Sequence, residues 1–293
     1  MKDVFSKEIH VLEYHDKCIK VDNFSIDTLQ EVINHSKPGY VIYVNGGVYQ
    51  GHISINIPYL TVIGEETILD GCGEGRVLSI SAPFIEIRGF IITNGEVGIQ
   101  LGEPDYIVDA INCCIVDNYI SDTTIGINLS ETEQNLIERN SIVDNLIGVK
   151  STASHSNILA YNRVESNKEG FSFTYGSNWN KILNNSIKMN DYGVKLKLSH
   201  YNIVDGNKIV FNNVGVYLQN AISTEIRYNN ISCNQGYGVF FRGDKPDLRY
   251  NWWGSRFGPS WLIPVFGDRV WGINHGICFP VKRLCYPWLV ESI

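Results

Sequence analysis

The chain has 293 residues, of which 44% are hydrophobic, so it can bury a sizeable core. Its formal net charge of −7 argues against nucleic-acid binding, which needs a basic surface. No apolar stretch is long enough to span a bilayer, and residues 1–23 are too mixed and charged to indicate a secretory signal.

The N-terminal region divides into two predicted parts. Residues 1–24 show no clear pattern and are interpreted as an N-terminal extension. In residues 25–39, Ile26, Leu29 and Ile33 have helical spacing, and a Lys-Pro-Gly run ends the pattern. Because the terminal edges of a repeat array must be covered, we expect this short helix to cap the first repeat.

Three apolar runs rich in β-branched residues follow the helix, at residues 40–49, 60–64 and 67–71. Their composition and their Gly-containing boundaries predict short strands. They read Tyr-Val-Ile-Tyr-Val, Leu-Thr-Val-Ile-Gly and Thr-Ile-Leu-Asp-Gly at their most regular points.

From residue 118 onward, one phrase returns about every 22 residues. It consists of Asn, then Ile or Val two places later, then a second Asn, a Gly and an apolar residue. The copies begin at Asn118, Asn140, Asn162, Asn185, Asn207 and Asn229. A fixed period of this size is the signature of a solenoid.

Within each repeat, apolar residues alternate in short bursts, which is the period of a β-strand. Three short strands and three turns fill about 22 residues, so each repeat predicts one coil of a parallel β-helix, with coils about 4.8 Å apart. We expect about nine or ten coils. The Asn residues are expected to adopt the left-handed conformation at sharp turns and to hydrogen-bond from coil to coil. The Gly is expected to mark the next bend.

The C-terminal residues 252–293 differ from the repeats and are rich in Trp, Pro and Gly, which predicts an aromatic cap on the last coil. The β-helix itself is expected over residues 40–251, and the whole chain is expected to be one structural domain. Among the seven Cys, only Cys278 and Cys285 are considered as a disulfide pair.

The entry runs and the Asn/Gly repeats resemble the pectate-lyase-like right-handed parallel β-helix superfamily. More narrowly, the repeats and the closing Asn-Trp-Trp-Gly, Gly-Pro and Pro-Trp-Leu stretches are similar to NosD-type proteins and archaeal surface proteins with carbohydrate-binding repeats. The resemblance implies a right-handed coil, a polysaccharide or glycan surface as partner, and an extracellular or cell-surface location. It covers roughly residues 25–290 and specifies the fold more strongly than the chemistry.

Equivalent positions of successive coils form columns, and two columns follow the repeat Gly. The first holds Asn128, Lys150, Ser172, Lys195 and Tyr217, and the second holds Ser130, Thr152, Thr174, Lys197, Gln219 and, nearby, Arg242. We interpret Lys195, Lys150 and Tyr217 as catalytic candidates, and Lys197, Gln219, Arg242 and Asn128 as substrate-binding candidates. The alternative is a solvated face that keeps the solenoid soluble.

A third column precedes the repeat phrase and holds Glu133, His155, Asn178 and His200. Glu133 and His155 belong to adjacent coils, so a carboxylate could orient an imidazole for acid–base catalysis. His200 is a substrate-binding candidate. The alternative for all four residues is a set of turn-forming polar residues.

Two classes of function stay open from the sequence. The first is a carbohydrate-binding or scaffold protein on a glycan surface, and the second is a polysaccharide lyase, hydrolase or epimerase. The Asp clusters of calcium-dependent pectate lyases are missing, although calcium remains a cofactor to consider if the protein is a lyase. A NosD-type role in metal maturation is a further alternative, yet no His, Cys and Met cluster with metal-ligand character is visible. No other cofactor is predicted, and the oligomeric state is left open.

Overall fold

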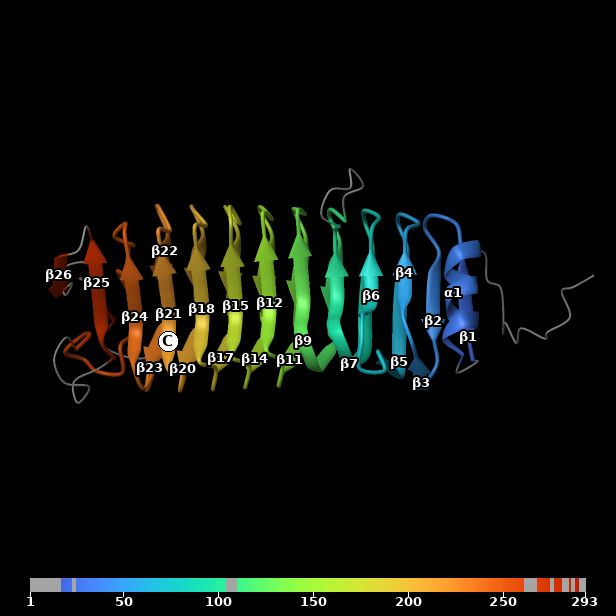
Figure 1. The fold of residues 1–293 in the computed structure, drawn as a ribbon, viewed down its shortest axis with the longest axis horizontal. Coiled ribbons are helices and arrows are strands. Elements are labelled where there is room, and N and C mark those ends of the chain that lie inside the picture. Colours follow the sequence, from blue (N-terminus) through green and yellow to red (C-terminus); the bar gives the residue numbers. More distant parts are fainter. Residues whose placement is uncertain are drawn as a thin grey trace, which may run out of the picture.

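The computed structural model describes residues 17–22, 25–103, 110–260, 268–274, 277–280, 285 and 288–289. Over these residues the chain winds into a parallel β-solenoid of about ten coils with about 22 residues each. Figure 1 shows the coils stacked in sequence order from the helix α1 to the strand β26. The predicted fold class and its period are therefore confirmed.

Each coil contributes one strand to each of three faces. Face 1 contains β4 (Ile53–Ile55), β6 (Arg76–Ile80), β12 (Ile147–Thr152), β15 (Glu169–Thr174), β18 (Tyr192–Lys197), β21 (Val214–Gln219), β24 (Tyr237–Arg242) and β25 (Val270–Asn274). Face 2 contains β1 (Cys18–Val21), β2 (Val41–Val44), β8 (Cys114–Val116), β10 (Leu136–Glu138), β13 (Ile158–Ala160), β16 (Lys181–Leu183), β19 (Ile203–Asp205) and β22 (Glu225–Arg227). Face 3 contains β3 (Gly47–Gln50), β11 (Ser141–Val143), β14 (Arg163–Glu165), β17 (Ser186–Lys188), β20 (Lys208–Val210) and β23 (Asn230–Ser232).

Three longer strands bend from one face to another and connect the early coils. They are β5 (Thr61–Asp70), β7 (Glu86–Leu101) and β9 (Tyr119–Ser130). All described pairings between coils are parallel, whereas β26 (Ile277–Pro280) pairs antiparallel with β25. The inward positions of the three faces form one continuous core of Ile, Val, Leu and Phe, in which Phe171 and Phe173 are fully buried.

Helix α1 (Ile26–His35) lies at the N-terminal end of the solenoid, as predicted. It buries Leu29 and Ile33 against the core. Its Gln30 side chain also bonds with the backbone of Ser54 in β4, donating at 3.0 Å and accepting at 2.8 Å. The helix thus satisfies backbone groups of an edge strand. The strand β1 precedes the helix and pairs with β2, so regular structure begins inside the stretch expected as an extension. No helix in the described ranges is long and apolar enough to cross a membrane.

In the described part of the C-terminal region, two of the Trp residues expected to form a cap are packed against other residues. Trp253 is fully buried in the core cluster. Trp288 packs on Gly258, where an added Cβ would come within 2.7 Å of the indole ring, and its Nε1 donates to the Arg256 carbonyl at 3.2 Å. The side chain of Cys278 lies outside the described residues, so its pairing with Cys285 stays a prediction.

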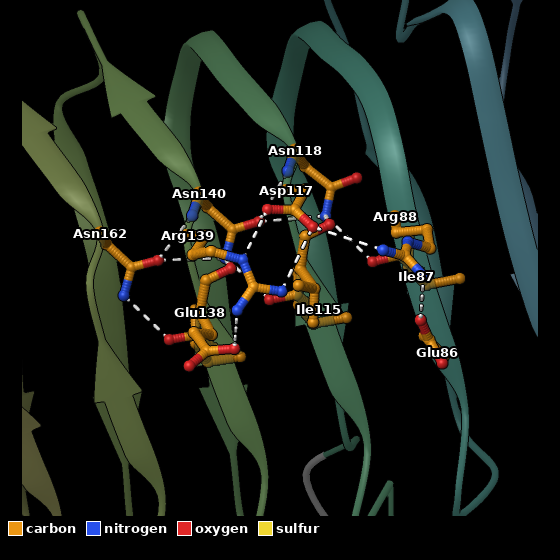
Figure 2. Close-up of polar contacts among 12 residues, drawn as sticks. Glu86, Ile87, Arg88, Ile115, Asp117, Asn118, Glu138, Arg139, Asn140 and Asn162 are labelled. Atoms are coloured by element: carbon orange, nitrogen blue, oxygen red, sulfur yellow. Dashed lines mark hydrogen bonds and ion pairs between the residues drawn. The ribbon is translucent and has the colours of Figure 1, made fainter.

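Buried Asn residues form hydrogen-bonded ladders along the corners between faces. At the corner from face 2 to face 3, the backbone N–H and Nδ2 of each Asn donate to Oδ1 of the Asn one coil further on, at 2.8–3.1 Å. This ladder runs through Asn118, Asn140, Asn162, Asn185, Asn207, Asn229 and Asn251, and Figure 2 shows its first members. The predicted coil-to-coil bonding is confirmed.

The left-handed residue at these corners is not the ladder Asn but the residue before it. Tyr161, Asn184 and Tyr228, each next to a ladder Asn, have φ values of 54–55°. The expectation that the repeat Asn supplies the left-handed conformation is therefore wrong. The Asn is selected because its amide can both donate and accept inside the stack.

A second ladder runs along the corner from face 3 to face 1, and a third, from Asn135 to Asn202, lies on the corner from face 1 to face 2. The second ladder ends on Asp268, which accepts from the Nδ2 of Asn234 at 2.5 Å. Burial raises the pKa of the Asp268 carboxyl to about 6, although the bonds from Asn234 act in the opposite direction.

The repeat Gly lies within a strand of face 1 and not at a bend, so that expectation is also wrong. At Gly148, Gly170 and Gly193, an added Cβ would lie 2.5–2.7 Å from the carbonyl oxygen of the equivalent Gly in the next coil. Gly is required at this position because the backbones of successive coils approach too closely for a side chain.

Candidate functional site

The outward columns of face 1 have the predicted register. Asn128, Lys150, Ser172, Lys195 and Tyr217 are partners across successive coils. The second column likewise pairs Ser130, Thr152, Thr174, Lys197, Gln219 and Arg242. The structure therefore brings the seven face 1 candidates into two adjacent rows along one side of the solenoid.

The N-terminal half of these rows is polar and lacks aromatic side chains. Asn128 donates from Nδ2 to Oε1 of the buried Gln100 at 2.8 Å, and its own Oδ1 is buried without a hydrogen bond in the described part of the chain. Ser172 is buried between its neighbours Lys150 and Lys195. This half therefore offers small polar groups close to the backbone.

Lys195 is held by its own neighbours. Its ammonium forms an ion pair with the carboxylate of Glu169, which lies in the preceding coil, and it lies 5.4 Å from the centre of the Tyr192 ring. About a quarter of the Lys195 side chain is exposed. A lysine that acts as a base must reach the substrate, whereas this ammonium is already engaged by Glu169. The observed contacts thus suit an electrostatic role better than proton abstraction.

The C-terminal half of face 1 is aromatic and basic. Tyr217 stacks on Phe240 with ring centres 5.7 Å apart, and Trp271 of β25 is the next member of the same column. The Arg242 guanidinium lies 5.7 Å from the Phe240 ring centre. We call Tyr217, Phe240, Trp271, Lys197 and Arg242 the aromatic–basic patch.

Gln219 and Tyr192 border this patch. The hydroxyl of Tyr217 donates to Oε1 of Gln219 at 3.4 Å, and the Tyr192 ring meets the Tyr217 ring edge-on at 5.6 Å. These contacts fix the orientation of Tyr217, so the patch is preformed.

The sequence interpretation missed three residues of this face. Phe240 lies in a repeat lengthened by one residue, and it follows Tyr217 in the column. Trp271 follows Phe240 by 31 residues, outside the 22-residue period, so counting repeats could not find it. Glu169 lies at the start of its strand, and only the structure shows that it reaches Lys195.

The third predicted column is also formed, at the corner between face 1 and face 2. Glu133 and His155 form a parallel β-bridge, but no bond between the Glu133 carboxylate and the imidazole occurs within the described residues. Instead, His155 Nδ1 accepts from the backbone N–H of Asn178 at 3.4 Å, and His200 Nδ1 accepts from that of Ile222 at 3.1 Å. Each imidazole therefore carries its proton on Nε2 when neutral.

The charged residues of face 2 are largely paired with one another. Figure 2 shows Arg88 and Arg139 converging on Asp117, with Glu86 and Glu138 as further partners. Further along, Asp247 contacts both Arg227 and Arg249. These contacts hold the pKa of the Asp247 carboxyl well below its ordinary value, with the hydrogen bonds from Arg249 as the largest cause. These carboxylates and guanidinium groups are therefore engaged by one another.

The parallel β-helix with an N-terminal helix, an aromatic C-terminal cap and Asn ladders defines the class of protein. Its fold is that of the pectate-lyase-like right-handed β-helix class. The family model described as "Periplasmic copper-binding protein (NosD)" matches residues 65–191 and 183–251. The chain belongs to this NosD family. A comparison with curated proteins gives no match.

Solved structures with the same fold share little sequence with this chain. Tailspike protein 2 of bacteriophage CBA120, in its enzymatically active domain, is 14% identical with a TM-score of 0.66 over 76% of this chain, which spans only 39% of that domain. The A-module of the Azotobacter vinelandii mannuronan C-5 epimerase AlgE4 is 14% identical with a TM-score of 0.58, covering 85% of this chain and 90% of the module. Pectate lyase Pel9A is 12% identical with a TM-score of 0.56, covering 86% and 75% respectively. These similarities establish the fold and not the activity.

Proposed function

We propose that this protein binds a polysaccharide along face 1, with the aromatic–basic patch as the main contact, and that it acts as a binding or scaffold protein on a glycan surface. The observation that carries the proposal is the run of Tyr217, Phe240 and Trp271 in one column beside Lys197 and Arg242 in the next. Coils about 4.8 Å apart present this chemistry as a straight strip, which suits an extended polymer.

The chemistry of the patch suits a sugar chain with acidic groups. Aromatic rings offer apolar surface to the C–H face of a pyranose, and Arg and Lys can pair with carboxylate or sulfate groups. The Phe240 ring supports the Arg242 guanidinium, which leaves its N–H groups available to a ligand. Gln219, next to Tyr217, can hydrogen-bond a hydroxyl.

The structural neighbours support a carbohydrate ligand by analogy of fold. One is named as a mannuronan C-5 epimerase and another as a pectate lyase. The family description contains the word periplasmic, which supports a location outside the cytoplasm. Each of these statements belongs to the named protein, and the transfer to this chain is part of the proposal.

Catalysis is the second candidate, because Lys195 and Tyr217 are adjacent in one column with Lys150 two coils away. The ion pair between Lys195 and Glu169 favours binding over proton transfer. The candidate groups for a lyase, hydrolase or epimerase activity are these residues and the Glu133–His155 corner.

Copper binding, which the family description names, does not fit the described residues. Over the parts of the chain that the structure describes, no group of three or more His, Cys, Asp or Glu is arranged so that it could hold a metal ion. The Nδ1 atoms of His155 and His200 are already bonded to backbone N–H groups. We therefore assign no copper chemistry to the solenoid.

The proposal is tested by measuring the affinity of the protein for acidic and neutral polysaccharides by affinity electrophoresis and calorimetry. The variant K197A/R242A removes two cations that lie two coils apart in one column of face 1. The control R163A/K208A removes two cations at the same spacing on face 3. We expect a loss of about tenfold or more only in the first variant. Equal losses of affinity in both variants would show that only the net charge matters and would contradict the proposed site. Absence of binding to every polymer would reject the proposal.

A further inference from the structure

A second surface feature lies on the corner between face 1 and face 2, which begins just after Lys197 of the aromatic–basic patch. Trp179 and Tyr201 occupy equivalent positions in successive coils, and their rings stack with centres 5.4 Å apart and an angle of 5° between planes. About half of each side chain is exposed, at 53% and 47%. Two large aromatic side chains so exposed gain little from burial in the core, so their stack is available to a ligand.

The stack has a small residue on either side. The same column holds Ser156 one coil before Trp179 and Ser223 one coil after Tyr201, and all four residues have φ values of 51–57°. The backbone bonds from Ser156 to Asn178 and from Tyr201 to Ile222 place them in line. No bulky side chain of this column therefore covers the outer face of either ring.

Two imidazoles flank the stack. The His155 ring lies 5.9 Å from the Trp179 ring, and the His200 ring lies 6.4 Å from the Tyr201 ring. Because backbone N–H groups are bonded to both Nδ1 atoms, each neutral ring presents an Nε2–H donor, for which the described residues supply no acceptor. The two donors are two coils apart, roughly 9–10 Å at the usual strand spacing.

We propose that this corner, made of His155, Trp179, His200 and Tyr201, is a separate binding site for an uncharged hexopyranose unit of a polysaccharide. The flat apolar face of a sugar ring packs on the exposed indole or phenol ring, and the fixed Nε2–H groups donate to its hydroxyl or ring oxygens. The repetition over two coils fits a sugar chain that runs parallel to the solenoid axis. This inference rests on the proposed glycan-binding function and adds a site with a different preference from the cationic patch.

The corner also gives His155 and His200 a common interpretation. Asn178 lies between the two histidines in this column, and its Oδ1 accepts from the backbone N–H of His200 at 2.6 Å. The Nδ1 atoms of His155 and His200 accept from the next coil in the same way. An Asn at either His position would keep the bond to the next coil and remove the imidazole donor. The substitutions His155→Asn and His200→Asn therefore separate ligand binding from coil stacking.

The test compares binding of a neutral glucan, a neutral mannan, pectate and alginate to four proteins. They are the wild type, W179A/Y201A, H155N/H200N and the control Y228A/Y250A, which removes another stacked pair with ring centres 5.2 Å apart on a different corner. We expect W179A/Y201A to lose about tenfold or more in affinity for a neutral polymer, and H155N/H200N to lose several-fold, while the control stays within about twofold. Thermal unfolding of each variant shows whether the coil is intact.

Each outcome is decisive for the site. Neutral-polymer affinity that is unchanged in W179A/Y201A, or reduced equally in Y228A/Y250A, would overturn the corner site and leave the face 1 proposal standing. Neutral-polymer affinity lost in K197A/R242A but not in W179A/Y201A would place all binding on face 1 and also overturn it. A wild type that binds none of the four polymers would reject both the corner site and the proposed function.

Discussion

Asn234 and Asp268 join the repeats to the C-terminal cap. The backbone N–H and the Nδ2 of Asn234 donate to Oδ2 of Asp268 at 3.1 and 2.5 Å, where every earlier step of the ladder uses an Asn oxygen. The last acceptor is thus a carboxylate 34 residues further along the chain. Arg269 beside it directs its Nε to the Gly236 carbonyl.

The position of Asp268 predicts a pH-dependent stability. Burial raises the pKa of its carboxyl to about 6, above its ordinary value of 3.8, so the folded state holds the proton more tightly than the unfolded state. Its contribution to the free energy of unfolding is on the order of 3 kcal/mol. This stabilisation is fully present below about pH 4 and is lost as the pH rises through 6. We expect Asp268→Asn to abolish this part of the pH dependence, measured as the difference in unfolding free energy from wild type between pH 4 and 8. Asp144→Asn, at an exposed corner, is the control. A constant difference for Asp268→Asn across that range would contradict the assignment.

Removing one Asn from the middle of a ladder should destabilise the fold strongly. Asn185 accepts two bonds from Asn162 and donates to Leu159 and Asn207. Asn185→Ala leaves these buried groups without partners, and we expect a loss of about 2–5 kcal/mol by denaturant unfolding. Asn230→Ala, which removes a half-buried amide whose Oδ1 accepts one bond from the Ser232 hydroxyl at 2.8 Å, should cost less than about 1 kcal/mol. Similar losses at the two positions would show that ladder burial is unimportant.

A methyl group at the repeat Gly should also be poorly tolerated. At Gly193 an added Cβ would lie 2.6 Å from the Gly215 carbonyl oxygen and 3.2 Å from the Ile187 side chain. Backbone cannot move away as a flexible side chain could, so Gly193→Ala should cost about 1–3 kcal/mol. Calorimetric unfolding beside Ser186→Ala, an exposed-face control in β17, measures the effect. An unchanged melting temperature in Gly193→Ala would refute the close-approach argument.

A reducing-end assay separates binding from catalysis. We expect the wild type to release no new reducing ends from acidic or neutral polysaccharides, with or without calcium, because the Lys195 ammonium is already ion-paired with Glu169. New ends that vanish in Lys195→Ala would establish a lyase or hydrolase and place its chemistry on face 1. The variant Lys168→Ala, which removes a neighbouring exposed cation, controls for charge.

The strict period of the repeats explains why the sequence predicts so much of the fold. Once the coil length is fixed, residues 22 or 23 apart must be neighbours, and this spacing alone is enough to place Lys150, Lys195 and Tyr217 in one column. The third Asn ladder was not predicted because its members, such as Asn157, precede strands outside the repeating phrase. The left-handed positions were not predicted because they carry Tyr, Arg or Ser as readily as Asn.

The candidate site was predicted less completely for physical reasons. A period gives the position of a side chain along the solenoid but not the contact that its end makes, so the Lys195–Glu169 pair and the bonded His155 Nδ1 could not be predicted. Trp271 follows its column neighbour Phe240 by 31 residues, which is not the length of the repeat. The repeat period therefore predicts which residues share a column only within the regular repeats.

The Asn ladders have a direction, and this direction has a consequence for how the protein is made. Each amide of an earlier coil donates to an oxygen of a later one, so during synthesis from the N-terminus every new coil emerges before its acceptor exists. Among the ladder residues, Asn234 has the longest delay between its own synthesis and that of its acceptor, because Asp268 is made 34 residues later. A nascent chain that stops before Asp268 lacks the acceptor of Asn234, so the second ladder is complete only when the cap has been made.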